Sequence, residues 1–233
     1  MGWYVVAVLA ELPDTFDSVR SLVKLNLAGN QLTALPPSLG RMASLAVLDA
    51  SHNRLEALPP LDRSLKLTTL NLAANALANL PSLSGCGALT DLDLSQNKLS
   101  AWPTLPAEGG LVRLAMNNNA VGPDMPAPLV WALRGSLKEL QVSYCGLEEL
   151  PAEVGALRSL RVLNAEFNEL RDIPATLGYL PDISALRCAW RWRWAHRSGG
   201  GGRGFRHWGN MPNKTRALAF WAIRSLLRRA HLL

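Results

Sequence analysis

The sequence predicts an α/β solenoid, in which short parallel strands from successive repeats stack into one open sheet. Two observations carry this prediction. Leucine accounts for 45 of the 233 residues, and it recurs in the pattern L-x-x-L-x-L-x-x-N-x-L. Seven clear copies follow one another at intervals of 22 to 26 residues, starting at positions 22, 45, 67, 89, 111, 137 and 160. Repetition at such a period indicates stacked units that share one continuous core.

The first half of each copy predicts a strand. In the first copy, Leu25 and Leu27 alternate with polar residues, and this period of two is typical of a strand with one buried face. Asn30 is expected to turn its amide inward and satisfy backbone groups of the loop that leaves the strand. Cys145 replaces the asparagine in the sixth copy with a small thiol, which is a weak donor.

The second half of most copies reads Leu-x-x-Leu-Pro, as at residues 32–36 and 147–151. Proline lacks an N–H donor and restricts φ, so extended or single-turn segments are expected on the convex side. The short turns that reach Gly40, Gly155 and Gly178 are expected to stop at the glycine.

The fifth copy is the longest and departs most from the pattern. Its residues 122–128 are rich in proline and lead into an apolar segment. Pro128 near the start of this segment and Gly135 beyond its end predict the only true helix on the convex side. The insertion is interpreted either as a binding loop or as a variation in length without a function.

Partial copies flank the seven clear ones. Residues 9–13 match the second half of an earlier copy, and the apolar residues at 4–8 are expected to form its strand. An eighth copy begins at residues 183–188 and then breaks off. The sequence therefore predicts a repeat array over residues 1–188, which could be part of a longer array.

These copies resemble the leucine-rich repeat family, and above all the intracellular Leu-Pro-type repeats of leucine-rich repeat-containing protein 40 and the Ras-group repeat proteins. The resemblance extends from residue 9 to about residue 188. It implies a horseshoe-shaped array with a parallel sheet on the concave side. It also implies a non-catalytic scaffold that holds a polypeptide on that sheet.

Residues between the inward leucines are expected to point out from the concave face. Asp49, Asp91 and Asp93 would form an acidic centre able to receive a basic segment. Tyr144 and Phe167, in adjacent copies, are candidates for binding hot spots. The alternatives for this aromatic pair are ordinary surface, or a surface covered by the C-terminal segment. The predicted partner-binding set is Asp49, His52, Asp91, Asp93, Arg113, Glu139, Tyr144, Asn164, Glu166 and Phe167.

No catalytic or metal site is predicted. Asp91 and Asp93 share a strand face, but no neighbouring group indicates an acid with a raised pKa. Neither a phosphate-binding loop nor a Ser–His–Asp set is suggested. The chain has three cysteines, Cys86, Cys145 and Cys188, which lie far apart in the sequence. This odd number and wide spacing indicate neither a disulfide framework nor a thiolate metal site. We therefore predict no enzyme activity and no cofactor.

The chain is expected to be intracellular, and more specifically cytoplasmic. No run of 18 uninterrupted apolar residues occurs, so no transmembrane segment is predicted.

Residues 189–233 form a basic tail rich in Trp, Arg and Gly. They hold ten basic and no acidic residues, whereas the rest of the chain holds 14 basic and 18 acidic residues. The tail is expected to be partly disordered, with one helix over residues 215–232. It could bind nucleic acid, or contact an anionic membrane through residues 215–233. Alternatively, its helix covers the open end of the array, or a shifted reading frame or retained intron produced the segment.

Overall fold

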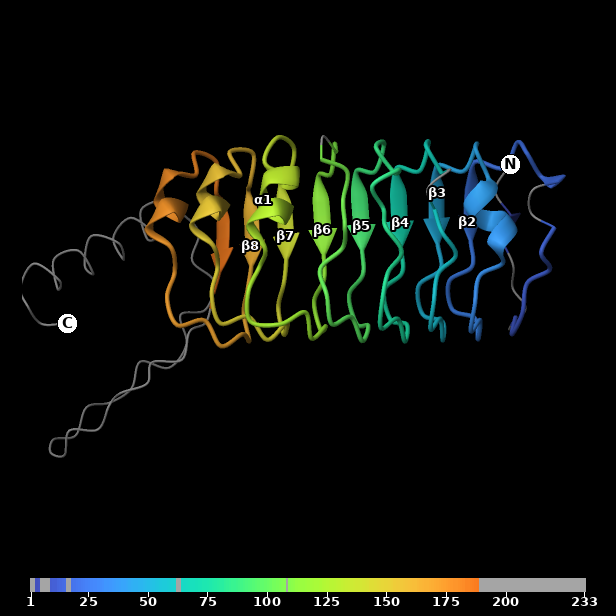
Figure 1. Ribbon diagram of the computed structural model, residues 1–233, viewed down its shortest axis with the longest axis horizontal. Coiled ribbons are helices and arrows are strands. Elements are labelled where there is room, and N and C mark those ends of the chain that lie inside the picture. Colours follow the sequence, from blue (N-terminus) through green and yellow to red (C-terminus); the bar gives the residue numbers. More distant parts are fainter. Residues whose placement is uncertain (1–2, 5–8, 16–17, 62–63, 108, 189–233) are drawn as a thin grey trace, which may run out of the picture.

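The computed structural model describes residues 3–4, 9–15, 18–61, 64–107 and 109–188. These residues form one elongated array of stacked repeats (Figure 1). The expected tail, including the helix over 215–232, lies outside the described residues, as do residues 5–8 of the expected first strand. The domain boundary at residue 188 stays a prediction.

Parallel strands pair in chain order along the whole described array, which confirms the predicted fold class. Their register is unbroken, so that Leu25, Leu48 and Leu70 lie opposite one another on successive strands. The described part of the chain holds nine strands in a single sheet. They are β1 (Trp3–Tyr4), β2 (Lys24–Asn26), β3 (Val47–Asp49), β4 (Thr69–Asn71), β5 (Asp91–Asp93), β6 (Arg113–Ala115), β7 (Glu139–Gln141), β8 (Val162–Asn164) and β9 (Ala185–Arg187).

The hydrophobic core runs continuously between the copies. Leu48, Leu70, Leu92 and Leu114 occupy the same position in four successive strands, and each is fully buried. Burial of one such side chain contributes about 1.5–3 kcal/mol. Each leucine is covered partly by the copies before and after it, so stability depends on stacking.

The asparagines bind backbone groups of the loop that leaves their own strand, as predicted, and also backbone groups of the preceding copy, which was not predicted. Nδ2 of Asn119 donates to the carbonyl oxygen of Leu94 in the preceding copy at 3.0 Å, and to that of Met116 at 2.9 Å. Its Oδ1 accepts from the N–H of Leu99 at 3.0 Å. We call this set of bonds the asparagine ladder. The same bonds recur at Asn53, Asn75, Asn97 and Asn168.

Cys145 interrupts the asparagine ladder on one side only. Its Sγ donates to the carbonyl oxygen of Met116 at 3.2 Å, so the thiol replaces the amide as a donor. Within the described residues, the N–H of Val121, which an asparagine at position 145 would bind, has no acceptor. Burial raises the pKa of the Cys145 thiol to about 11, so the thiol remains protonated at neutral pH.

The convex side consists mainly of single turns, as the prolines predict. The one α-helix within the described residues, α1 (Ala127–Leu133), starts next to Pro128 and ends just before Gly135, also as predicted. Figure 1 shows α1 lying in front of the strands. The other convex elements are the 3₁₀ turns η2 (Pro37–Arg41), η3 (Ala152–Ala156) and η4 (Ala175–Tyr179).

The expectation that Gly40, Gly155 and Gly178 stop these turns is wrong. Each glycine lies inside its 3₁₀ turn, and none has a left-handed φ. A Cβ at position 155 would lie 2.5 Å from Cβ of Thr176 in the next copy, and one at position 40 would collide with the carbonyl oxygen of Pro60. A Cβ at position 178 would meet no atom within 4 Å. Glycine is therefore required at two of the three positions by the close approach of the next copy.

Candidate functional site on the concave face

The residues between the inward leucines stabilise the backbone at the ends of strands β2, β3, β4, β5 and β8. Oδ1 of Asp49 accepts hydrogen bonds from the N–H of Ser51 at 3.0 Å and from its hydroxyl at 2.7 Å. Oδ1 of Asp93 and of Asn164 each accept from the N–H two residues further on, at 3.0 and 3.2 Å. Such bonds define Asx turns. Three of the predicted partner-binding residues therefore have a structural role that the sequence analysis missed.

A row of residues with left-handed backbone follows the ends of strands β2 to β8. At the six non-glycine positions φ lies between 53° and 57°. This conformation is unfavourable for a residue with a Cβ by about 1–2 kcal/mol, so the surrounding hydrogen bonds must maintain it. We call these positions the rim row, because each lies just beyond the C-terminal end of a strand. The rim row comprises Gly29, His52, Ala74, Gln96, Asn118, Tyr144 and Phe167.

Tyr144 and Phe167 stack on each other in the rim row. Their ring centroids lie 4.4 Å apart and the ring planes differ by 9°. Both rings are accessible, with exposed fractions of 50% and 59%. The structure thus brings the two predicted aromatic residues together as one exposed apolar surface, which we call the aromatic pair.

Arg113 joins acidic residues from the two neighbouring strands. Its guanidinium lies 3.4 Å from Oδ2 of Asp93 on β5 and 3.6 Å from Oε1 of Glu139 on β7. Nε2 of Gln141 also donates to Oε1 of Glu139 at 2.9 Å. Exposed ion pairs contribute only about 0–1 kcal/mol, so the main effect of this network is to hold the charged groups in place.

The predicted acidic centre is divided in two. Asp49 and Asp93 occupy the same register position on β3 and β5, but β4 lies between them. Adjacent strands are about 4.8 Å apart, which separates the two backbones by about 10 Å. Asp49 and His52 therefore belong to one part of the face, while Asp91 lies with the network around Arg113. Glu166 lies outside the rim row and is the residue immediately before Phe167 in the sequence.

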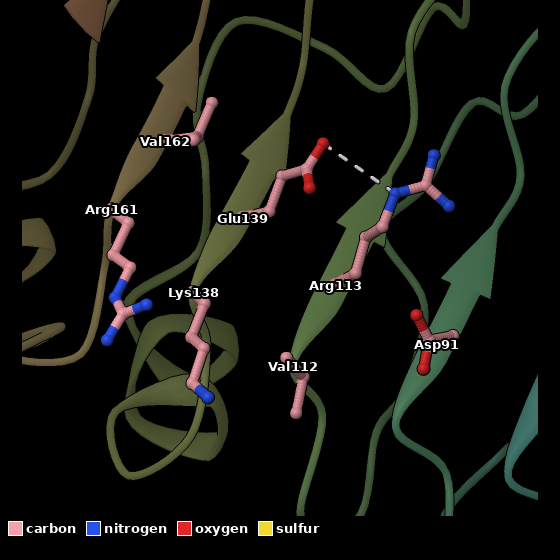
Figure 2. Close-up of a pocket in the computed structure, with 7 residues that line it drawn as sticks. All are labelled: Asp91, Val112, Arg113, Lys138, Glu139, Arg161 and Val162. Atoms are coloured by element: carbon pink, nitrogen blue, oxygen red, sulfur yellow. Dashed lines mark ion pairs between the residues drawn. The ribbon is translucent and has the colours of Figure 1, made fainter. Parts of the chain in front are cut away.

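An open depression lies beside the Arg113 network and contains two cations that the sequence analysis missed. Lys138 and Arg161 are both exposed, and each lies one residue before its strand. The N–H of Arg161 donates to the carbonyl oxygen of Lys138 at 2.8 Å, which fixes the two residues side by side. Figure 2 shows the residues that line the depression: Asp91, Val112, Arg113, Lys138, Glu139, Arg161 and Val162.

A signal for these cations is present in the sequence. The equivalent residues of the five earlier copies are uncharged, whereas two adjacent copies carry a base in the same register. The earlier residues are Val23, Ala46, Thr68, Thr90 and Val112.

Other site types are not found in the part of the chain that the structure describes. There, no group of three or more His, Cys, Asp or Glu residues could hold a metal ion. No helix in the same residues has the length and apolar character needed to cross a membrane.

Comparisons with known proteins agree with the repeat and the fold. A family model described as Leucine Rich Repeat matches residues 21–42. Human "Leucine-rich repeat protein 1" is 41% identical over 51 residues, which make up 22% of this chain and 12% of that protein.

Two solved structures illustrate the similarity of fold. A leucine-rich repeat protein of Leptospira interrogans superposes with a TM-score of 0.60 at 25% identity, over 77% of this chain and 52% of that one. The ectodomain of the receptor kinase GASSHO1/SCHENGEN3 from Arabidopsis thaliana, solved in complex with CASPARIAN STRIP INTEGRITY FACTOR 2, superposes with a TM-score of 0.58 at 27% identity. This match covers 77% of this chain and 26% of the ectodomain, so the chain spans only part of each relative.

Proposed function

We propose that this chain is a leucine-rich repeat protein that acts as a non-catalytic scaffold and binds a polypeptide partner on the concave face of its sheet. Leucine-rich repeat proteins typically act as interaction scaffolds, and the Arabidopsis ectodomain was solved in complex with a partner. An intracellular, cytoplasmic location is part of the proposal, because the odd number of cysteines indicates no disulfide framework.

The aromatic pair is the observation that carries this proposal. Elsewhere the rim row holds only glycine, alanine or polar side chains, so Tyr144 and Phe167 are its only large apolar residues. Aromatic residues dominate the energetics of many protein interfaces. The Asx turn at Asn164 holds the backbone before Phe167. The backbone N–H groups of Tyr144 and Cys145 donate to Glu166 and Asn168 of the next copy at 3.2 and 2.9 Å. A partner therefore has little conformational entropy to remove from this surface when it binds.

The test compares two double variants of the full chain. Replacement of both aromatic residues, Tyr144→Ala with Phe167→Ala, is expected to abolish partner capture without unfolding the array. The matched control is Gln96→Ala with Asn118→Ala, which alters two exposed residues of the same row that have the same left-handed backbone and lie outside the predicted partner-binding set. Quantitative affinity purification and mass spectrometry from cells measures the bound proteins, and thermal melting verifies folding.

Two results would contradict the proposal. One is an unchanged set of bound proteins for the folded aromatic double variant. The other is an equal loss of those proteins for the control variant, because a general disturbance of the rim row would then account for the effect.

A further inference from the structure

The two ends of the strand pair β7 and β8 carry surfaces of different chemistry. Lys138 and Arg161 lie just before the two strands, and the aromatic pair Tyr144 and Phe167 lies just beyond them. Both surfaces are exposed, and both are formed by the same two adjacent copies. A polypeptide lying along this part of the sheet would meet both.

In the described part of the chain the two cations have no acidic partner. Within the described residues neither Lys138 nor Arg161 forms an ion pair, whereas the nearby Glu139 is engaged by Arg113. Figure 2 shows both cationic side chains pointing the same way, away from the carboxylate of Glu139. Their backbones are about 4.8 Å apart, so the two like charges repel each other. A carboxylate bound between them would remove this repulsion.

The walls of the depression favour one acidic side chain over a polyanion. Val112 and Val162 supply apolar surface, while Asp91 and Glu139 supply negative charge. A row of phosphates, as in nucleic acid or an anionic membrane, would place several negative charges near these carboxylates. A peptide places one carboxylate at the cations and apolar groups beside it.

The separation of the two surfaces limits the length of the segment that could bridge them. Lys138 precedes Tyr144 by six residues in the sequence. At about 3.3 Å per residue, the Cα atoms of these two residues are at most about 20 Å apart. An extended polypeptide covers that distance with about five to six residues.

We propose that strands β7 and β8 recognise an extended segment with an acidic side chain at one end and an aromatic or other large apolar side chain about five to six residues away. The acidic side chain binds Lys138 and Arg161, and the apolar side chain packs on the aromatic pair. This inference rests on the proposed function, since it assigns a chemistry to the partner of the concave face.

The experiment is selection of a displayed library of random 12-residue peptides on the purified full chain. Enriched peptides are expected to share an acidic residue and a large apolar residue at the stated spacing. The charge-reversal variant Lys138→Glu with Arg161→Glu should weaken an enriched peptide by at least about tenfold. In a repeated selection it should enrich a basic residue in place of the acidic one.

Two controls keep the result specific. Arg20→Glu with Lys66→Glu reverses two exposed cations in the loops before β2 and β4, which gives the same net charge far from the depression. The milder pair Lys138→Ala with Arg161→Ala should show the same direction of effect if charge reversal disturbs folding, which thermal melting reports.

The possible outcomes separate this inference from the proposed function. If no peptide is enriched, this inference is overturned, while the proposed function is still decided by the affinity purification of the Tyr144→Ala with Phe167→Ala variant. If peptides are enriched and depend on the aromatic pair but show no acidic residue, or are insensitive to changes at Lys138 and Arg161, only this inference is overturned. Equal weakening by the variant at Arg20 and Lys66 also overturns it, because general attraction to a basic chain would explain the binding.

Discussion

Replacement of Asn119 by alanine tests whether the asparagine ladder stabilises the array. Asn119 has an exposed fraction of only 6%. The replacement removes donors to the carbonyl oxygens of Leu94 and Met116, and the acceptor for the N–H of Leu99. These three backbone groups lie between two copies, where water replaces the lost bonds poorly.

The expected loss of stability follows from these three bonds. A net contribution of about 1 kcal/mol for each bond predicts that Asn119→Ala lowers the free energy of unfolding by about 3 kcal/mol. Backbone groups that stay buried without a partner would raise this value. The loss is a large part of the about 5–15 kcal/mol that stabilises a typical domain.

Urea unfolding followed by circular dichroism measures this change. The control is Ala120→Ser, because Ala120 is exposed and adjacent in sequence. Asn119→Cys should fall between the two, since the thiol of Cys145 donates to a backbone carbonyl but accepts no bond from Val121. Amide hydrogen exchange should accelerate at Leu99 in both Asn119 variants, because its acceptor is removed.

A stabilising role of the asparagine ladder would be contradicted by a loss below about 1 kcal/mol for Asn119→Ala, which is the value of a single bond. It would equally be refuted if exchange at the Leu99 amide were unchanged.

Three further predictions concern other positions of the array. Gly155→Ala should lower the free energy of unfolding by about 1–3 kcal/mol, because the added Cβ would collide with Thr176 of the next copy. Gly178→Ala should change it by less than about 0.5 kcal/mol, because no atom lies near the added Cβ. Equal melting temperatures for the two variants would contradict this. Cys145 should resist iodoacetamide at pH 8 in the folded protein and react in urea, because burial raises the pKa of its thiol to about 11. Labelling is measured by mass spectrometry, and rapid labelling of the native protein would contradict this prediction. His52→Gly should stabilise the array by about 0.5 kcal/mol in urea unfolding. Gly29 already occupies the same left-handed position, and the relief of backbone strain is expected to exceed the added entropy of the unfolded chain. A less stable variant would contradict this expectation.

Much of the fold could be predicted from local patterns. The alternation at Leu25 and Leu27, repeated at a constant period, specifies where each strand lies and which face it buries. Asn30 and its equivalents could be assigned to the backbone because a buried amide needs partners on both sides. Pro128 and Gly135 were sufficient to place α1, because proline fixes a φ suited to the first helical turn and glycine disfavours continuation of the helix, both independently of the neighbouring copies.

The candidate site was predictable only in part. Tyr144 and Phe167 could be proposed from their type and their equivalent positions in adjacent copies. Their parallel stacking, and the left-handed backbone beneath them, depend on hydrogen bonds between copies. The same is true of Lys138 and Arg161, whose lack of acidic partners becomes apparent only when Glu139 is seen bound to Arg113.

The sequence by itself therefore determined the repeat, its register and its core, because these follow from a period that every copy carries within itself. Only the folded arrangement showed that Asp49 and Asp93 stabilise the turns after their strands, and that the next copy approaches closely enough to require glycine at position 155. It also placed the cations at one end of β7 and β8 and the aromatic pair at the other. The physical reason is that each of these features is a relation between neighbouring copies, or a backbone conformation maintained by them.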